Sequence, residues 1–393
     1  MIEEFHIELT ANILPFWMNK MADSENGGFY GRIDGSGILH KQANKGSVLN
    51  MRILWAFSAA YRILCREEYL EMANRAFDYI QSHFIDYKNG GVYWELNCKG
   101  KPVNTKKQVY AQGFALYAFS EYYRATQNTK ALELSKEFFY LIEGQCKDKE
   151  RGGYFEAFTE DWKPIDDMRL SGKDANEKKT MNTHLHILEP YTNLYRVWPD
   201  KNLQRAQTEL IDIFSNQILN KRNHHLNLFF DDNWNSKSTI VSYGHDIEAS
   251  WLLFEAADVL GDKKLRAKVR RISLRIVDAA MEGFREDGSL IYETAGAHAD
   301  TDRHWWVQAE AVVGLMYAHK NSGDKVHKEK AAKTWEYIKR YLIDYKSGEW
   351  YWSVLQDGSI NLKDDKAGCW KCPYHNGRMC MEMIEHFSDD KTN

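Results

Sequence analysis

Apolar residues recur at three- and four-residue spacing along several stretches of the chain, with charged residues between them. Residues 69–85, 131–145 and 329–343 follow this pattern, which predicts amphipathic α-helices with one face against a core. A second group of stretches is apolar around more of the circumference, so we expect these helices to be buried on more sides. It comprises residues 53–64, 113–126, 249–260 and 309–320.

A short motif of glycine followed by aromatic residues repeats between these helices. Its clearest copies lie at 27–30, 90–94 and 152–155, and weaker copies lie at 228–230, 288–292 and 348–352. The spacing is about sixty residues apart from one longer step, and such self-similarity marks a repeat architecture. The segments FIDYKNGGVYWEL (84–96) and LIDYKSGEWYWSV (342–354) show two copies of the repeat.

Each motif follows a helix of the first group and precedes one of the second, so the repeating unit is outer helix, β-hairpin, inner helix. Residues 1–21 supply the first outer helix and 377–387 end the last inner one. An open solenoid is the alternative to a closed ring, but a solenoid needs polar caps that neither end resembles. We predict an all-α (α/α)6 barrel of twelve helices with short β-hairpins between helix pairs, built as a single catalytic domain over residues 1–393.

Composition and charge narrow the class of protein. Hydrophobic residues make up 44% of the chain, which is enough for a large core, and the formal net charge of -4 argues against a nucleic-acid partner. The N-terminus lacks a secretory pattern, no apolar run is long enough for a membrane span, and the six cysteines are expected to be reduced. We expect a cytoplasmic protein with no membrane partner, either a monomer or a weak homo-oligomer.

The longest irregular stretch covers about residues 159–181, FTEDWKPIDDMRLSGKDANEKKT. A loop of this length inside a compact domain is usually functional, as a lid or a binding loop. The 13 Trp, 22 Tyr and 18 Phe residues fit a large core together with a cleft in which aromatic rings stack on a sugar.

Unusual polar residues gather where the inner helices begin. Because each inner helix starts just after a hairpin or loop, all of these starts should open on one end of the barrel. Histidine titrates near neutral pH and can both give and take protons. Two histidines facing one carbon indicate proton removal on one side and proton return on the other. The segments concerned are 50–52, 182–186, 244–248, 304–308 and 370–376.

Metal binding and hydrolysis are the alternative chemistries. His184 and His186 do not share a helix face, and Cys369 and Cys372 form only half of a typical zinc site, so we expect no metal and no cofactor. The chain has no Gly-x-Ser-x-Gly motif and no phosphate loop. A glycoside hydrolase needs two carboxyl groups beside the scissile bond, for which the candidates are Asp246, Glu248 and Glu310.

At these residues the chain resembles the N-acylglucosamine 2-epimerase superfamily, and within it most closely the cellobiose 2-epimerases. The resemblance extends from ENGGFYG (25–31) to PYHNGRMC (373–380). Its most specific parts are KTMNTHLHILEPYTNLY (179–195), SYGHDIEASWLL (242–253) and HWWVQAEAV (304–312). The family fold is an (α/α)6 barrel.

The resemblance implies reversible epimerisation at C2 of the reducing-end glucose of β-1,4-linked disaccharides, through ring opening and a cis-enediolate. His245 and His375 would be the acid/base pair, and His186 would assist ring opening or hold the O1/O5 end. Arg52 would stabilise the enediolate oxygens. Glu248, three residues after His245 on the same helix face, would orient that imidazole and favour its protonated form.

Substrate binding is assigned by the same resemblance. The tryptophans would stack on sugar rings, Tyr110 and Asn182 would bind hydroxyl groups, and the long loop would add two contacts. The sequence leaves open whether Trp305 or Trp306 faces the cleft and which sugar is preferred. An N-acylglucosamine 2-epimerase, an aldose–ketose isomerase, a glycoside hydrolase and a non-catalytic glycan-binding protein remain alternatives. The substrate-binding residues implied are Tyr110, Asn182, Trp306, Trp370, Ser171 and Asp174.

Overall fold

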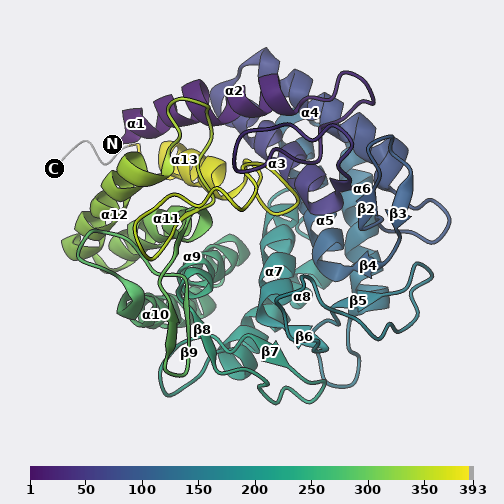
Figure 1. Ribbon diagram of the computed structural model, residues 1–393. Helices are drawn as coiled ribbons and strands as arrows, with labels where there is room; N and C mark the ends of the chain where they lie inside the picture. Colours follow the sequence, from purple (N-terminus) through teal and green to yellow (C-terminus); the bar gives the residue numbers. More distant parts are fainter. Residues whose placement is uncertain (389–393) are drawn as a thin grey trace.

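The computed structural model describes residues 1–388 as two concentric rings of helices around a central axis (Figure 1). The inner helices lie nearest the axis and are almost entirely buried on their N-terminal halves. The prediction of a twelve-helix (α/α)6 barrel is confirmed. The inner helices are α3 (Ser47–Leu64), α5 (Val109–Thr126), α7 (Met181–Tyr195), α9 (Tyr243–Leu260), α11 (Trp305–Ser322) and α13 (His375–His386).

The outer helices form the second ring, and most of them end in a turn of π-helix. Their charged residues face outward, as the amphipathic pattern predicts. The first outer helix runs through α1 (Ile2–Ile7), η1 (Glu8–Ile13), α2 (Leu14–Phe16) and η2 (Trp17–Met21). The others are α4 (Glu67–Tyr79) with η3 (Ile80–Phe84), α6 (Thr129–Leu141) with η4 (Ile142–Cys146), α8 (Lys201–Ile213) with η5 (Phe214–Ile218), α10 (Lys263–Ala280) with η6 (Met281–Gly283), and α12 (Lys325–Tyr337) with η7 (Ile338–Leu342).

The glycine–aromatic motifs form tight turns, each closed by an isolated bridge such as Ile85 with Val92 or Lys147 with Tyr154. Longer antiparallel pairs join neighbouring repeats, because a strand just before an inner helix pairs with a strand of the next repeat. The sheets are β1 (Lys45–Gly46), β2 (Glu95–Leu96) and β3 (Pro102–Asn104); β4 (Lys107–Gln108) with β5 (Ala157–Phe158); β6 (Lys179–Thr180) with β7 (Phe229–Phe230); β8 (Ile240–Ser242), β9 (Glu293–Ala295) and β10 (His298–Asp300); and β11 (Arg303–His304) with β12 (Ser353–Val354).

A buried ion pair secures several of these turns. In the second repeat, Asp86 accepts hydrogen bonds from the backbone N–H groups of Lys88 and Asn89, and its Oδ2 lies 2.8 Å from Nζ of Lys107 on β4. Burial opposes ionisation of Asp86, but the hydrogen bonds from Lys107 and Asn89 together outweigh it and lower the pKa of the carboxyl to about 2. Equivalent pairs join Asp23 to Lys45, Asp148 to Lys179 and Asp344 to Lys366.

The ring closes where the first repeat meets the last. Ile33 bridges Ala367, and α13 packs against α1 and α3 (Figure 1). One continuous core of buried side chains runs from Phe5 to Phe387. Among residues 1–388, no helix combines the length and the apolar character needed to cross a membrane.

Candidate active site

The starts of the inner helices surround a cavity of about 430 Å³ at one end of the barrel. Every site residue predicted from the sequence lines this cavity. The set spans all six inner helices, the segment before α13 and the long loop, so the barrel brings together residues up to about 320 positions apart. It comprises Arg52, Tyr110, Ser171, Asp174, Asn182, His186, His245, Glu248, Trp306, Trp370 and His375.

His375 is the first residue of α13, and a carboxylate holds its ring. Nδ1 of His375 lies 2.7 Å from Oε1 of Glu310 on α11. A carboxylate only accepts hydrogen bonds, so Nδ1 carries the hydrogen and Nε2 of the neutral ring is free to act as a base. Burial lowers the pKa of His375, as does the positive charge of Arg52.

His186 lies on α7 at a kink in the helix. Its backbone is not helical (φ -88°, ψ 15°), and the residue four positions later is Pro190, which has no N–H to donate to the His186 carbonyl. Nδ1 of His186 lies 3.0 Å from Oε2 of Glu189. Gly113 on α5 packs against the kink, since an added Cβ there would lie 2.3 Å from the His186 carbonyl oxygen.

His245 lies in the first turn of α9, and its Nδ1 is 2.8 Å from Oγ of Ser242. Burial lowers the pKa of His245 to about 3, and His186 adds to the effect. The ring of Trp306 lies 4.9 Å from the His245 ring and 5.6 Å from the His375 ring. Trp306 therefore contacts both members of the predicted acid/base pair.

The prediction that Glu248 orients His245 is wrong, because the imidazole of His245 forms its hydrogen bond with Ser242. Glu248 instead accepts a 2.7 Å hydrogen bond from Nη2 of Arg378. Its Oε1 also lies 3.9 Å from Nε2 of His186 and 3.9 Å from Nδ1 of His375. Residues three apart on a helix do lie on one face, but the guanidinium in the barrel centre offers a stronger, charged partner.

Arg378 and three carboxyl groups form a buried network behind the histidines. Arg378 donates through Nη2 to both Glu248 and Glu310 and through Nη1 to Glu189. Burial raises the pKa of Glu248 to about 8, and the negative charge of Glu310 adds to this shift. Burial opposes ionisation of Glu189, but Arg378, His186 and Tyr374 together outweigh it and lower the pKa of Glu189 to about 2.

The place where this network could bind a metal ion is already occupied by the guanidinium of Arg378. Within residues 1–388, the His/Cys/Asp/Glu group with ligand-like spacing is Glu248, Glu310 and His375, whose atoms lie within 4.8 Å of one another. Arg378 already donates to both of these glutamates. A metal ion in this place would have to displace the guanidinium, so the geometry does not favour a metal site.

Arg52 presents a buried positive charge to the cavity. Its Nη2 donates a 2.7 Å hydrogen bond to the hydroxyl of Tyr110, and its guanidinium lies over the rings of Phe114 and Tyr374. In the described part of the chain, no carboxylate forms an ion pair with Arg52, and its buried Nε has no partner. The charge is therefore available to an anionic group in the cavity.

The sequence left open whether Trp305 or Trp306 faces the cleft, and the structure shows that both line the cavity. Trp305 is buried and packs on Trp352 with ring centres 4.5 Å apart. Trp306 is only partly buried and lies beside the two histidines. Trp370 is also partly buried, with its ring 6.0 Å from Trp94 and 6.1 Å from Tyr110.

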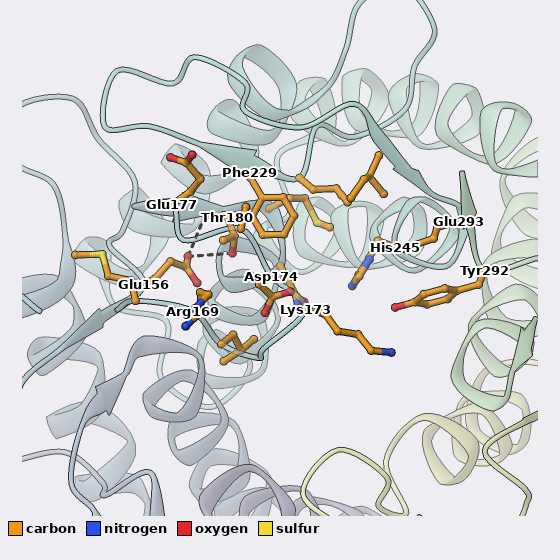
Figure 2. Close-up of a pocket in the computed structure, with 17 residues that line it drawn as sticks. Glu156, Arg169, Lys173, Asp174, Glu177, Thr180, Phe229, His245, Tyr292 and Glu293 are labelled. Carbon is orange, nitrogen blue, oxygen red and sulfur yellow. Dashed lines mark hydrogen bonds between the residues drawn. The ribbon is translucent and has the colours of Figure 1, made fainter. Parts of the chain in front are cut away.

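The long loop lines part of the cavity through residues 170–174. Asp174 accepts a 2.7 Å hydrogen bond from the backbone N–H of Ser171, so the two predicted contacts stabilise a turn of the loop. Lys173 and Asp174 extend from this loop to the side of His245, where a smaller pocket of about 110 Å³ adjoins the cavity (Figure 2).

Sequence reasoning missed several functional groups. Glu310 was considered only as a hydrolase carboxylate, and Ser242, Glu189, Tyr374 and Arg378 received no role. Their signal is positional. The sixth residue of each of the first five inner helices points into the same layer of the barrel. These residues are Arg52, Phe114, His186, Glu248 and Glu310.

The (α/α)6 barrel and its histidine-lined cavity define the class of protein to compare with this chain. Residues 28–377 match the family model described as N-acylglucosamine 2-epimerase (GlcNAc 2-epimerase). The chain belongs to this family.

Full-length relatives support this assignment. The chain is 57% identical over 385 residues to a cellobiose 2-epimerase of Bacteroides fragilis, covering 97% of this chain and 98% of that protein. Its structure is similar to that of a cellobiose 2-epimerase from Bacillus thermoamylovorans, with a TM-score of 0.94, 44% identity and 98% of each chain covered. A sugar epimerase from a ruminal bacterium gives a TM-score of 0.96 at 42% identity, covering 99% of this chain and 100% of that one.

Proposed function

We propose that the protein is a cofactor-free cellobiose 2-epimerase, an isomerase that interconverts glucose and mannose at the reducing end of β-1,4-linked disaccharides. Cellobiose would give glucosyl-mannose, and lactose would give epilactose. The observation that carries the proposal is that His245 and His375 both lie beside the ring of Trp306. The full-length similarity to cellobiose 2-epimerases selects the substrate.

The proposed reaction begins with opening of the sugar ring, assisted by His186. One of His245 and His375 then removes the C2 proton, and the other returns a proton to the opposite face of the enediolate. Two bases on opposite faces are what inversion at one carbon requires, and general acid/base groups suit this task when their rings are held. Arg52 stabilises the negative oxygens of the enediolate, because its buried charge is not cancelled by a carboxylate.

Binding of a second sugar unit distinguishes a disaccharide from a monosaccharide substrate. The cavity extends from the histidines to the long loop and to Trp370. We propose that Trp306 and Trp370 stack on the sugar rings and that Tyr110 and Asn182 bind hydroxyl groups. Buried Oδ1 of Asn182 has no partner within the described residues, so it can accept a bond from a substrate hydroxyl. Ser171 and Asp174 would contact the second sugar from the loop.

Separate incubations with cellobiose, lactose, mannose and N-acetylglucosamine test the proposal. We expect epimers of the two disaccharides at rates unaffected by a chelator. Release of free glucose from cellobiose would indicate a hydrolase. Turnover of N-acetylglucosamine alone would indicate an N-acylglucosamine 2-epimerase, and a ketose product would indicate an aldose–ketose isomerase. Binding without product would indicate a glycan-binding protein.

We propose the cytoplasm as the compartment, because the six cysteines are unpaired.

A further inference from the structure

Ser242 is the N-cap residue of α9, but its hydroxyl does not cap the helix. Ser242 ends β8 and is the N-cap residue of α9, where a serine usually accepts a hydrogen bond from a backbone N–H of the first turn. Thr180 does this at the start of α7, accepting from the N–H of Thr183. Within residues 1–388, the buried Ser242 side chain makes no capping bond, and its Oγ lies 2.8 Å from Nδ1 of His245.

The partner of His245 also differs in kind from those of His186 and His375. Nδ1 of His186 contacts the carboxylate of Glu189, and Nδ1 of His375 contacts that of Glu310. A carboxylate stabilises an imidazolium strongly, whereas a neutral hydroxyl does so weakly. The two members of the proposed acid/base pair are therefore not equivalent.

We propose that Ser242 is a positioning residue for His245, which fixes Nδ1 so that Nε2 is the nitrogen presented to C2 and gives the ring a neutral partner in place of a carboxylate. The inference rests on the proposed epimerisation. A hydrogen bond at Nδ1 selects the ring orientation and the nitrogen that reacts. A neutral partner lets the protonated ring release its proton readily, either to the enediolate or to solvent.

Other charged groups act on the same ring and do not change when Ser242 is replaced. His186 on α7 disfavours the imidazolium, and Glu310 on α11 favours it. Lys173 and Asp174 of the loop, together with Tyr292, line the pocket beside it. Glu248 on α9 is directed away from this ring and accepts a hydrogen bond from Arg378.

The test compares Ser242→Ala, Ser242→Thr and Ser242→Asp with a matched serine on the same helix. Ser250 is also buried on α9, but its hydroxyl donates to the carbonyl of Ile247. We expect Ser242→Ala to lower kcat for cellobiose about 3- to 10-fold, the range of one net hydrogen bond, with KM changed by less than about 2-fold. Ser242→Thr should retain most activity, and Ser250→Ala should behave as wild type.

Ser242→Asp gives the sharpest readout because it creates a histidine–carboxylate pair like that of His375. The pKa of the acidic limb of the kcat–pH profile should rise, because the carboxylate favours the imidazolium. An unchanged profile in Ser242→Asp, or wild-type kcat in Ser242→Ala, would overturn the proposal. If Ser242→Ala fails to fold, Ser242→Cys, which is similar in size with a weaker hydrogen bond, replaces it in the comparison.

A measurement without substrate separates this proposal from the proposed function. In ¹⁵N-histidine NMR spectra, His245 should carry its hydrogen on Nδ1 in the wild type and in Ser242→Thr, and should show a mixed tautomer in Ser242→Ala. The same tautomer in all three proteins would contradict the role of Ser242. Failure of the wild type to epimerise cellobiose would refute the proposed function and leave the NMR result to decide the positioning.

Discussion

Three of the four histidines that line the cavity, His186, His245 and His375, have a hydrogen-bond partner at Nδ1, whereas His304 stacks on Tyr292. Two of the three partners are carboxylates, and the third is the hydroxyl of Ser242. The residue types of the site were predicted from the sequence, because histidine, arginine and tryptophan at helix starts are unusual there. The partners were not, because Glu310 and His375 are 65 residues apart and meet only when the barrel forms. Local spacing assigned Glu248 to His245, and long-range charge pairing with Arg378 overrode it.

Trp370 provides a test of disaccharide binding at the residue scale. We expect Trp370→Ala to raise KM for cellobiose about 5- to 10-fold, since stacking of one ring contributes on the order of 1 kcal/mol. KM for mannose should change less, because a monosaccharide covers less of the ring. Trp198→Ala, on the outer side of the barrel against Tyr140, is the control. Equal losses for both sugars would place Trp370 in a structural role.

The element scale explains why these residues converge. The second and sixth residues of an inner helix lie on one face, four apart, and supply Tyr110, Asn182 and Trp306 in one layer and Arg52, His186 and Glu248 in the next. The helical repeat could be predicted because its apolar pattern is local. The kink at His186 was signalled by Pro190, but its close contact with α5 depends on packing between repeats.

Gly113 tests that contact. An added Cβ would overlap the His186 carbonyl oxygen, so Gly113→Ala should push α7 away from α5. We expect a loss of about 1–3 kcal/mol in unfolding free energy and a fall in kcat through displacement of His186. Gly144→Ala, in η4 with no atom within 4 Å of the added Cβ, should be neutral or slightly stabilising. Urea unfolding measures the stability, and a kinetic assay measures kcat. If Gly113→Ala matched the wild type in both, α5 and α7 would be shown to move apart without cost.

At the scale of the whole molecule, the barrel depends on the seam between its first and last repeats. Glu8 on η1 accepts hydrogen bonds from Nε1 of Trp350 at 2.7 Å and from Nδ2 of Asn12 at 2.6 Å. Burial raises the pKa of Glu8 to about 7, and the negative charge of Glu349 adds to the effect. The repeat predicted that the ring closes, but it did not predict this seam, whose residues lie about 340 positions apart.

A pH dependence of stability follows from Glu8. Its folded pKa lies above the unfolded value, so the carboxyl is protonated in both states at low pH, and folding loses stability as the pH rises from about 4.5 to 7. Glu8→Gln removes this cost while keeping an acceptor for Trp350. We expect the variant to be up to about 3 kcal/mol more stable than wild type at pH 8 and nearly equal at pH 4.5, by urea unfolding. An equal difference at both pH values would show that folding does not raise the pKa of Glu8.

The central claim is that His245 and His375 act on opposite faces of C2, and deuterium exchange tests it most directly. Wild type, His245→Asn and His375→Asn are incubated with cellobiose in heavy water, and NMR measures deuterium at C2 in product and in recovered substrate. Wild type should place deuterium at C2 of the epimer. Each variant should lose about 10²- to 10⁴-fold in the rate of epimerisation. The variant that keeps the histidine facing the C2 proton of cellobiose should still exchange that proton for deuterium without inverting C2. Near wild-type epimerisation by either variant would remove that histidine from the pair, and product without deuterium would contradict exchange through the histidines.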